Sequence, residues 1–205
     1  MVCRADWAAV DSVAVDSVVV AALGEAGEDS VVAVRRGDGE MSLPRLVRHL
    51  MSSHWRVRRS FPPPVLSRIE AAIERSETRH GGQIRLAVEH ALETVPLLRG
   101  LSARERALDV FSELKVWDTE YNNGVLIYLL LADRDVEIVA DRGIHGRVGA
   151  QGWEAICREM ENAFREGNFE QGVLIGIERV SSLLESHYPG DRRVRNELPD
   201  RPVVL

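Results

Sequence analysis

The spacing of apolar residues along the chain alternates between the period of a helix and the pattern of a strand. Helical spacing follows the prolines at 62–64, returns after Ser102, and runs through two later segments, 153–164 and 173–184. Strand patterns lie between them. Residues 83–90 alternate, and residues 125–131 form a continuous apolar run, which is typical of a strand covered on both faces. A polar turn at 132–135 leads into a further strand at 136–139.

The resulting order is helix, strand, helix, strand, strand, helix, helix, which predicts an α/β fold. The first two strands are joined by a helix and should pair in parallel, whereas the second and third share a tight turn and should pair antiparallel. The expected architecture is an α/β/α sandwich, with a small mixed β-sheet covered by helices on both faces. Ser102 and Glu105 have the spacing of a capping box, Gly167 should end a helix, and Pro96 with Gly100 indicates a loop.

Composition divides the chain into four parts. Residues 65–189 contain the predicted elements and form the expected domain. Residues 41–64 are a basic amphipathic arm that ends in a Pro-rich break. Residues 190–205 are charged, contain prolines and are expected to be a mobile tail. Residues 1–40 are an atypical extension, rich in Val, Ala, Gly, Asp and Ser.

The first 40 residues differ in character from those that follow. They contain a near-repeat, VDSVA followed by VDSVV, at 10–19, and a weak strand pattern within 30–35. A segment of different composition begins at Met41. Two interpretations follow. The one we favour is that Met41 is the natural start and that residues 1–40 are translated upstream sequence; the other is that they form a regulatory extension.

The overall composition is that of a globular protein and argues against several classes of function. The chain has 205 residues, 45% apolar and 28% charged, which fits one domain with extensions. Its net charge of −6 argues against a nucleic-acid partner. Cys3 and Cys157 lie too far apart for a disulfide framework or a four-thiolate zinc site, which indicates a reducing setting. No apolar run approaches the ~20 residues of a membrane span and no signal peptide is recognisable, so we expect a cytoplasmic protein, peripheral to a membrane if associated with one.

A basic stretch, RLVRHLMSSHWRVRR, covers residues 45–59 and contains no acidic residue. Apolar residues share one side at helical spacing: Leu46, Val47, Leu50 and Met51. The candidate docking residues are Arg45, Arg48, Trp55, Arg56, Arg58 and Arg59. A basic amphipathic stretch with a tryptophan can bind an anionic membrane surface or a membrane protein. The alternative is an arm that packs its apolar side on its own domain.

Two polar segments, 117–124 and 140–146, flank the predicted hairpin. Their carboxylate and amide oxygens are the kind of ligand that Ca²⁺ and Mg²⁺ prefer. The candidate metal ligands are Asp118, Asn122, Asn123 and Asp141, and the candidate contacts to a phosphate or other ligand are Glu120 and Arg142. The alternative is turn chemistry, because Asn-Gly and Asp-x-Gly are common turn sequences and Asp141 can pair with Arg142.

Several blocks of sequence resemble the TPM domain family within residues 65–189. The matching blocks are residues 107–111, 123–127 and 136–144, then Trp153, Met160 and Phe164, then Phe169, Gly172 and Val173. The family includes the lumenal thylakoid phosphatase-like proteins and many bacterial membrane-linked proteins. The resemblance implies an α/β/α sandwich and, in some members, a divalent-cation site or an acid-phosphatase-like pocket in loops at one end of the sheet.

The chain departs from this family at two positions of the expected site. Asn123 stands where many members have Asp before Gly-Val-Leu, and Asp141-Arg142-Gly143 stands where many have Gly-x-Gly. The loss of a carboxylate lowers the affinity of such a site for a cation. Many members carry a signal peptide and a membrane anchor, whereas this chain shows neither and so resembles a cytoplasmic bacterial member.

Two functions are compatible with these residues. The first is a TPM-like binding or assembly module with a divalent-cation site, acting at a membrane surface or on a partner protein through residues 45–59. The second is a divalent-metal-dependent phosphatase for phosphomonoesters, in which Asp118, Asn123 and Asp141 hold the cation and Arg142 steadies the phosphate. A metal-bound water would be its nucleophile. We rank the first higher because no residue stands out as a general base.

Overall fold

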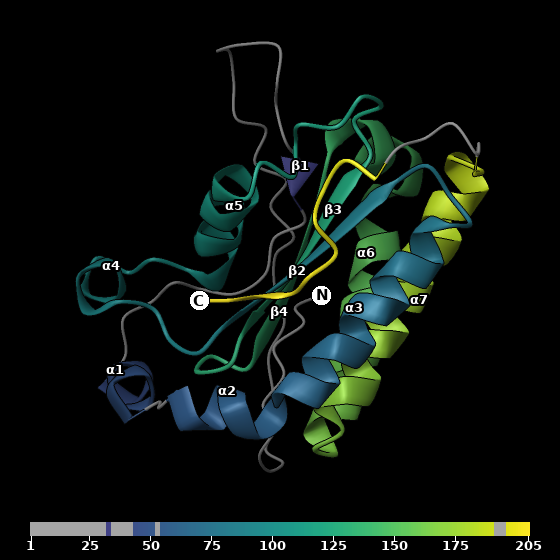
Figure 1. Cartoon of the computed structure of the whole chain (residues 1–205). Coiled ribbons are helices and arrows are strands. Elements are labelled where there is room, and N and C mark those ends of the chain that lie inside the picture. Colours follow the sequence, from purple (N-terminus) through teal and green to yellow (C-terminus); the bar gives the residue numbers. More distant parts are fainter. Residues whose placement is uncertain (1–31, 34–42, 52–53, 191–195) are drawn as a thin grey trace.

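The central sheet of the protein is mixed, as the order of predicted elements requires. The computed structural model describes residues 32–33, 43–51, 54–190 and 196–205. Within these residues, five strands pair in the order β1-β4-β3-β2-β5 (Figure 1). Their bounds are β1 Val32–Ala33, β2 Gln83–Glu89, β3 Gly124–Leu130, β4 Asp135–Ala140 and β5 Val203–Val204.

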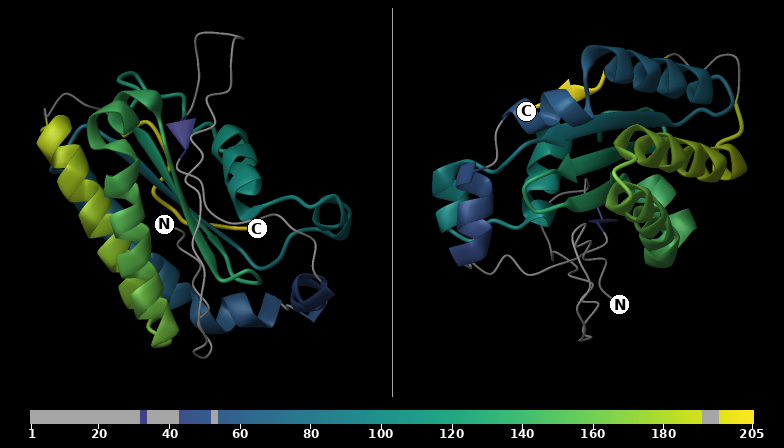
Figure 2. Two further views of the ribbon diagram at one scale, coloured as in Figure 1. Left: turned by 180° about the vertical axis from the view of Figure 1, so that it is seen from behind. Right: turned by 90° about the horizontal axis from the view of Figure 1, so that it is seen from below.

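Helices cover both faces of this sheet, which confirms the predicted α/β/α sandwich. One layer contains α3 (Pro63–Glu77), α6 (Arg142–Arg165) and α7 (Phe169–His187), and the other contains α5 (Ala103–Glu113) (Figures 1 and 2). At one end of the sheet lie α1 (Leu43–Met51), α2 (His54–Ser60) and α4 (Thr94–Leu98). The two helical layers enclose two separate apolar cores.

Strand β3 is at the centre and every one of its residues is buried. It pairs in parallel with β2, from Gln83 opposite Gly124 onwards, and antiparallel with β4. Both pairings were expected from the sequence. Alternate side chains of β3 enter the two cores: Val125 and Ile127 pack on the α3–α6–α7 side, and Leu126 and Tyr128 on the α5 side.

Local capping signals in the sequence explain where the helices begin and end. At the start of α5, the Ser102 hydroxyl accepts a hydrogen bond from Glu105 N (3.1 Å), and the Glu105 carboxylate accepts one from Ser102 N (2.9 Å). The predicted capping box is therefore confirmed. Gly167 follows the C-cap of α6 with φ 82°, a left-handed conformation that suits glycine.

Three expectations need correction. The loop expected at Pro96 is the short helix α4, because proline is tolerated in the first turn, where backbone N–H groups have no partner within the helix. The polar segment at 140–146, for which turn chemistry was the alternative, instead leads into the start of α6, and this helix is interrupted at Gly149 (φ 73°, ψ 168°). The tail expected to be mobile instead packs on the domain at 196–205, where β5 pairs with β2. The weak strand predicted within 30–35 is confirmed at Val32–Ala33, which form β1. Residues 1–31 and 34–42 lie outside the described residues.

Helices α6 and α7 approach each other closely through glycine. A Cβ atom added at Gly172 would lie 2.4 Å from Cε1 of Phe164 and 3.0 Å from the carbonyl oxygen of Met160. Phe164 is itself buried and its ring stacks on Phe169, with centroids 5.6 Å apart. The glycine is therefore required by packing rather than by its backbone conformation.

We predict that Gly172→Ala lowers the free energy of unfolding by about 1–3 kcal/mol, since the buried Phe164 ring must move to admit a methyl group. Gly146→Ala is the matched control, because a Cβ added at Gly146 meets nothing within 4 Å. In a helix this control should stabilise by up to about 1 kcal/mol. Urea denaturation of the full chain measures both, and equal effects at the two positions would contradict the close approach.

Candidate functional site

The two polar segments identified in the sequence meet at one end of the sheet. Residues 117–124 lead into β3 and residues 140–146 follow β4, so the antiparallel pairing of these strands places both segments at the same end. Asp141 N donates to the carbonyl of Gly124 (2.8 Å), and Ile144 N donates to that of Asn122 (3.2 Å). We call residues 117–124 and 140–146 the polar edge.

Asn123 and Asp141 are the buried members of the polar edge. Asn123 is 1% exposed; its Nδ2 donates to the carbonyl of Gly81 (3.0 Å), and its backbone N donates to Thr119 Oγ1 (3.1 Å). Its Oδ1 is buried and accepts no hydrogen bond from the described residues. Asp141 is the N-cap of α6, and its Oδ1 accepts from Arg142 N (2.7 Å). Asp141 thus has a local structural role, as the cap of a helix rather than as the turn residue considered from the sequence.

The remaining predicted site residues are exposed. They are Asp118, Glu120, Asn122 and Arg142. Asn122 adopts a left-handed conformation with φ 49°, as a residue of a tight turn, and its carbonyl already accepts from Ile144 N. In the part of the chain that the structure describes, no three His, Cys, Asp or Glu side chains are placed to hold a metal ion. The metal role of these residues stays a prediction.

The oxygens of the polar edge fit a divalent cation only in part. The buried Asn123 Oδ1 and the Asp141 carboxylate are hard donors of the kind that Ca²⁺ and Mg²⁺ take. A single buried carboxylate supplies little charge, however, and ligand charge helps to set affinity. The arrangement therefore suits a weakly held cation better than a tightly bound resident one.

The structure adds residues to this region that the sequence did not indicate. His80 is 3% exposed; its Nδ1 donates to the Gly82 carbonyl (3.1 Å), and burial lowers its pKa to about 4, so the ring is neutral at pH 7. Glu197 reaches the polar edge from the C-terminal segment and accepts a hydrogen bond from Glu120 N (2.9 Å). Both lie far from the polar segments in sequence, so no local spacing could have indicated them.

Tyr188, the residue that ends α7, packs against the polar edge. Its hydroxyl lies 2.9 Å from where a Cβ of Gly143 would be, and the Arg147 guanidinium lies over its ring, 4.5 Å from the centroid. Its carbonyl accepts from Gly81 N (2.9 Å), which joins it to the turn that holds Asn123. Gly143 therefore leaves room for this hydroxyl and for the carbonyl oxygen of Asn122, which would lie 2.4 Å from the same Cβ atom.

The opposite end of the sheet carries the basic arm, and here Arg45 has a different role from the one predicted. Arg45 is buried, and its Nε and Nη2 donate to Asp133 Oδ2 at 2.9 and 2.8 Å. His49 Nδ1 accepts from Leu92 N (3.0 Å), which leaves Nε2 to donate to Asp133 Oδ1 (2.9 Å). Burial by itself would raise the pKa of Asp133, but the bonds from His49 and Arg45 outweigh it and lower the pKa to about 2. Arg45 therefore anchors α1 to the β3–β4 turn and is not part of a docking surface.

Exposed apolar side chains cluster on α1 and α4, which lie side by side (Figures 1 and 2). Their exposed fractions are 46% for Val47, 62% for Leu50, 57% for Val95 and 49% for Leu98. Three arginines are also exposed at this end of the sheet, two on α2 and one directly after α4: Arg58, Arg59 and Arg99. We call these seven residues the docking end. The side chains of the other predicted docking residues, Arg48, Trp55 and Arg56, lie outside the described part of the structure.

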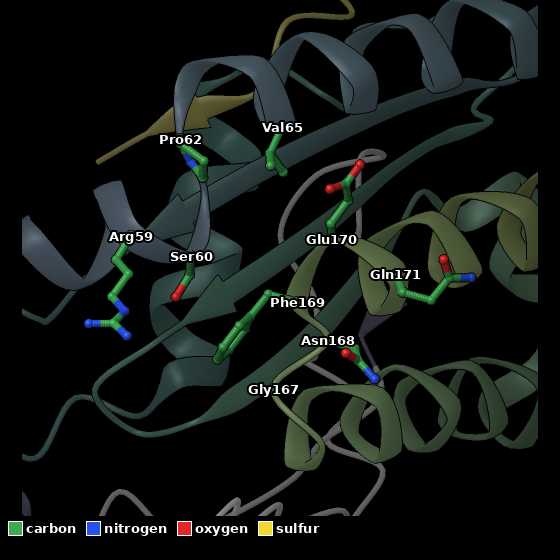
Figure 3. A pocket seen from close by; sticks show the side chains of 9 residues that line it. All are labelled: Arg59, Ser60, Pro62, Val65, Gly167, Asn168, Phe169, Glu170 and Gln171. Atoms are coloured by element: carbon green, nitrogen blue, oxygen red, sulfur yellow. The ribbon is translucent and has the colours of Figure 1, made fainter.

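A pocket of about 610 Å³ opens beside α2 (Figure 3). One wall is formed by Arg59, Ser60, Pro62 and Val65 where α2 meets α3, and the other by residues 167–171 where α6 meets α7. Phe169 points into the space between these walls, and Glu170 is held by an ion pair with Arg68. The volume is in the range of small-molecule pockets, and it adjoins the docking end at Arg59.

Within the described residues, none of the helices is both long and apolar enough to cross a membrane.

Comparisons with known proteins agree with the observed architecture. The chain is similar to the BA42 protein from the psychrophilic bacterium Bizionia argentinensis, with 31% identity and a TM-score of 0.62 over 69% of this chain and 93% of that one. It also shares its fold with the N-terminal domain of a protein from P. gingivalis, with 17% identity and a TM-score of 0.51 over 64% and 83% of the two chains. No curated protein matches significantly. Residues 61–183, more than half of the chain, match the model of the TPM domain, and the chain therefore belongs to the TPM domain family.

Proposed function

We propose that the chain is a binding module that docks on an anionic membrane surface through the docking end. The observation that carries this proposal is the exposure of four apolar side chains on two neighbouring helices, Val47 and Leu50 on α1 and Val95 and Leu98 on α4. Isolated exposed apolar residues are ordinary, but a group of them on neighbouring helices is typical of an interaction surface. An amphipathic helix that lies in a membrane interface has the same arrangement.

The charge distribution supports an anionic partner and determines which end of the module faces it. The whole chain carries a net charge of −6, whereas Arg58, Arg59 and Arg99 are exposed at the docking end. An anionic surface repels the acidic body and attracts this end, so the module approaches with α1 and α4 foremost. Each arginine near such a surface contributes about 1 kcal/mol, and the apolar side chains add to this on insertion, which gives reversible binding.

The attachment of α1 determines whether the docking end exists at all. Arg45 and His49 place α1 against Asp133, and on the other side of this helix Val47 and Leu50 are exposed. A helix this short does not persist alone in water. The buried carboxylate of Asp133 is therefore a structural requirement of the docking surface.

We predict that Leu50→Ser combined with Leu98→Ser weakens binding to phosphatidylserine-containing vesicles at least about tenfold, since two inserted side chains are removed. The measurement is co-sedimentation with phosphatidylcholine vesicles that contain or lack phosphatidylserine. Trp117→Ser with Tyr121→Ser is the matched control, because these exposed aromatic side chains lie at the polar edge. The proposal is wrong if the wild-type chain binds neither vesicle, or if both double variants bind equally.

We predict that Asp133→Asn lowers the free energy of unfolding by about 2 kcal/mol at pH 7. The pKa of Asp133 falls from 3.8 to about 2 on folding, so its stabilisation is present above pH 4 and is lost as the pH falls towards 2. Urea denaturation at pH 7 and near pH 2 should show the two chains converging in acid. Asp109→Asn, on the exposed side of α5, is the control and should have little effect at either pH.

A second role, weak binding of Ca²⁺ or Mg²⁺ at the polar edge, is supported by the buried Asn123 Oδ1, which accepts no hydrogen bond from the described residues. An acceptor oxygen left without a donor costs free energy in a folded protein, and a cation relieves that cost. Asn123, Asp141 and the exposed Asp118 and Asn122 would supply the ligands. Arg142 would contact an anion held by the cation, whereas the Glu120 carboxylate, which repels anions, would contact the cation or a hydrogen-bond donor of the ligand. The phosphatase hypothesis therefore requires this cation.

We predict that titration with Ca²⁺ or Mg²⁺ shifts backbone amide resonances of residues 117–124 and 140–146 at millimolar concentration. Asn123→Ala should abolish these shifts, since it removes the buried donor oxygen, whereas Asn162→Ala, in α6, should leave them unchanged. Hydrolysis of a generic phosphomonoester, with and without chelator, tests the phosphatase hypothesis in the same samples. Shifts spread evenly over the chain, or none, would reject the site.

A further inference from the structure

The C-terminal segment, residues 196–205, lies along the outer edge of β2 and outside the region matched by the family model, which ends at residue 183. Val203 and Val204 pair in parallel with Ala87 and Val88, and Leu205 N donates to the carbonyl of Val88 (2.9 Å). The domain therefore offers a strand edge, and this segment occupies it as an added strand.

Side chains of β2 extend this pairing by binding the main chain of the segment. Gln83 Oε1 accepts from the backbone N of Glu197 (2.8 Å) and of Leu198 (2.9 Å). Arg85 Nη1 donates to the carbonyl of Arg201 (3.2 Å). Contacts to the main chain hold an extended segment without reading its sequence, as in proteins that bind peptides by adding a strand.

Apolar side chains of the segment give the edge its selectivity. Leu198 is 7% exposed and belongs to the core on the α5 side of the sheet, and Val203 and Leu205 pack against the same core. An acceptable occupant therefore has apolar residues at positions equivalent to 198, 203 and 205, spaced as they are here. The chain's own residues 196–205 satisfy this pattern.

We propose that this segment is exchangeable, and that residues 196–205 of a second copy of the chain take the same place on the β2 edge. All the contacts described above join the segment to the domain, so each is reproduced when the segment comes from another copy. Exchange of an identical element between copies needs no new complementarity, which makes it a route to a dimer at little cost. The occupant is thus a second copy of this chain, bound by strand addition.

A disulfide between copies tests the exchange in full-length protein. One copy carries Ala87→Cys and the other Val203→Cys, which are paired positions, and both have Cys3→Ser and Cys157→Ala. Mild oxidation of the mixture should give a covalent pair of the two copies, in a yield that rises with concentration. A chain with both new cysteines should close internally, because paired strand positions are within reach of a disulfide.

Two controls distinguish exchange of the segment from random cross-linking between copies, and test whether the described contacts hold the segment. Ser112→Cys, exposed on α5, replaces Ala87→Cys and should give only background cross-linking with Val203→Cys. Gln83→Ala should speed exchange about tenfold, since two hydrogen bonds to the segment are lost, whereas Gln171→Ala should not. Internal closure without cross-linking above the Ser112 background overturns the proposal. So does failure of the double-cysteine chain to close, because Ala87 and Val203 are then not paired.

Discussion

Complete burial of strand β3 is the constraint on which the rest of the structure depends. A backbone without access to water must have its polar groups paired within the protein, so β3 requires a strand on each edge as well as a helical layer on each face. Strands β2 and β4 satisfy the edges. The layers are α5 on one side and α3, α6 and α7 on the other, each with its own core. Even the short strands β1 and β5 fit this scheme, because they cover the outer edges of β4 and β2.

The same constraint separates the two candidate surfaces. The chain enters β3 from the polar edge and leaves it at the β3–β4 turn, where Asp133 fixes α1. The length of a fully buried strand therefore lies between the candidate cation site and the docking end. A module held at a membrane by α1 and α4 would keep the polar edge directed away from the lipid. The proposed docking and the proposed cation binding would thus be independent in geometry, so that a variant could lose one and keep the other.

Patterns of neighbouring residues predicted those parts of the structure that local forces determine. The apolar run at 125–131 and the Ser102–Glu105 capping box are each determined by a few neighbouring residues. The strand and the helix start predicted from them were both confirmed. Arg45 was misread because its partner, Asp133, lies 88 positions away. One arginine among several in a basic stretch gives no sign that it is buried. The segment 196–205 was misread because the side chains that bind it, Gln83 and Arg85, lie more than 110 positions earlier in the sequence.

Asp141 shows why a site is harder to predict than a fold. Its carboxylate suggested a metal ligand or a turn residue, and the structure shows that it caps α6, a role that local sequence allowed. Sequence spacing also suggested the meeting of 117–124 with 140–146, since both flank one hairpin. It did not indicate His80, Tyr188 or Glu197, because these arrive from other elements through tertiary packing.

The interruption of α6 at Gly149 has a mechanical consequence for the polar edge. The turn that begins at the Asp141 cap and the core-facing stretch that includes Trp153 and Phe164 are joined by one residue whose backbone is not helical. A rigid helix would transmit any displacement of its first turn along its whole length to the packing against α7. Rotation about the backbone of a single glycine absorbs such a displacement instead. The first turn of α6 can therefore adjust to a ligand while the aromatic core beneath keeps its packing.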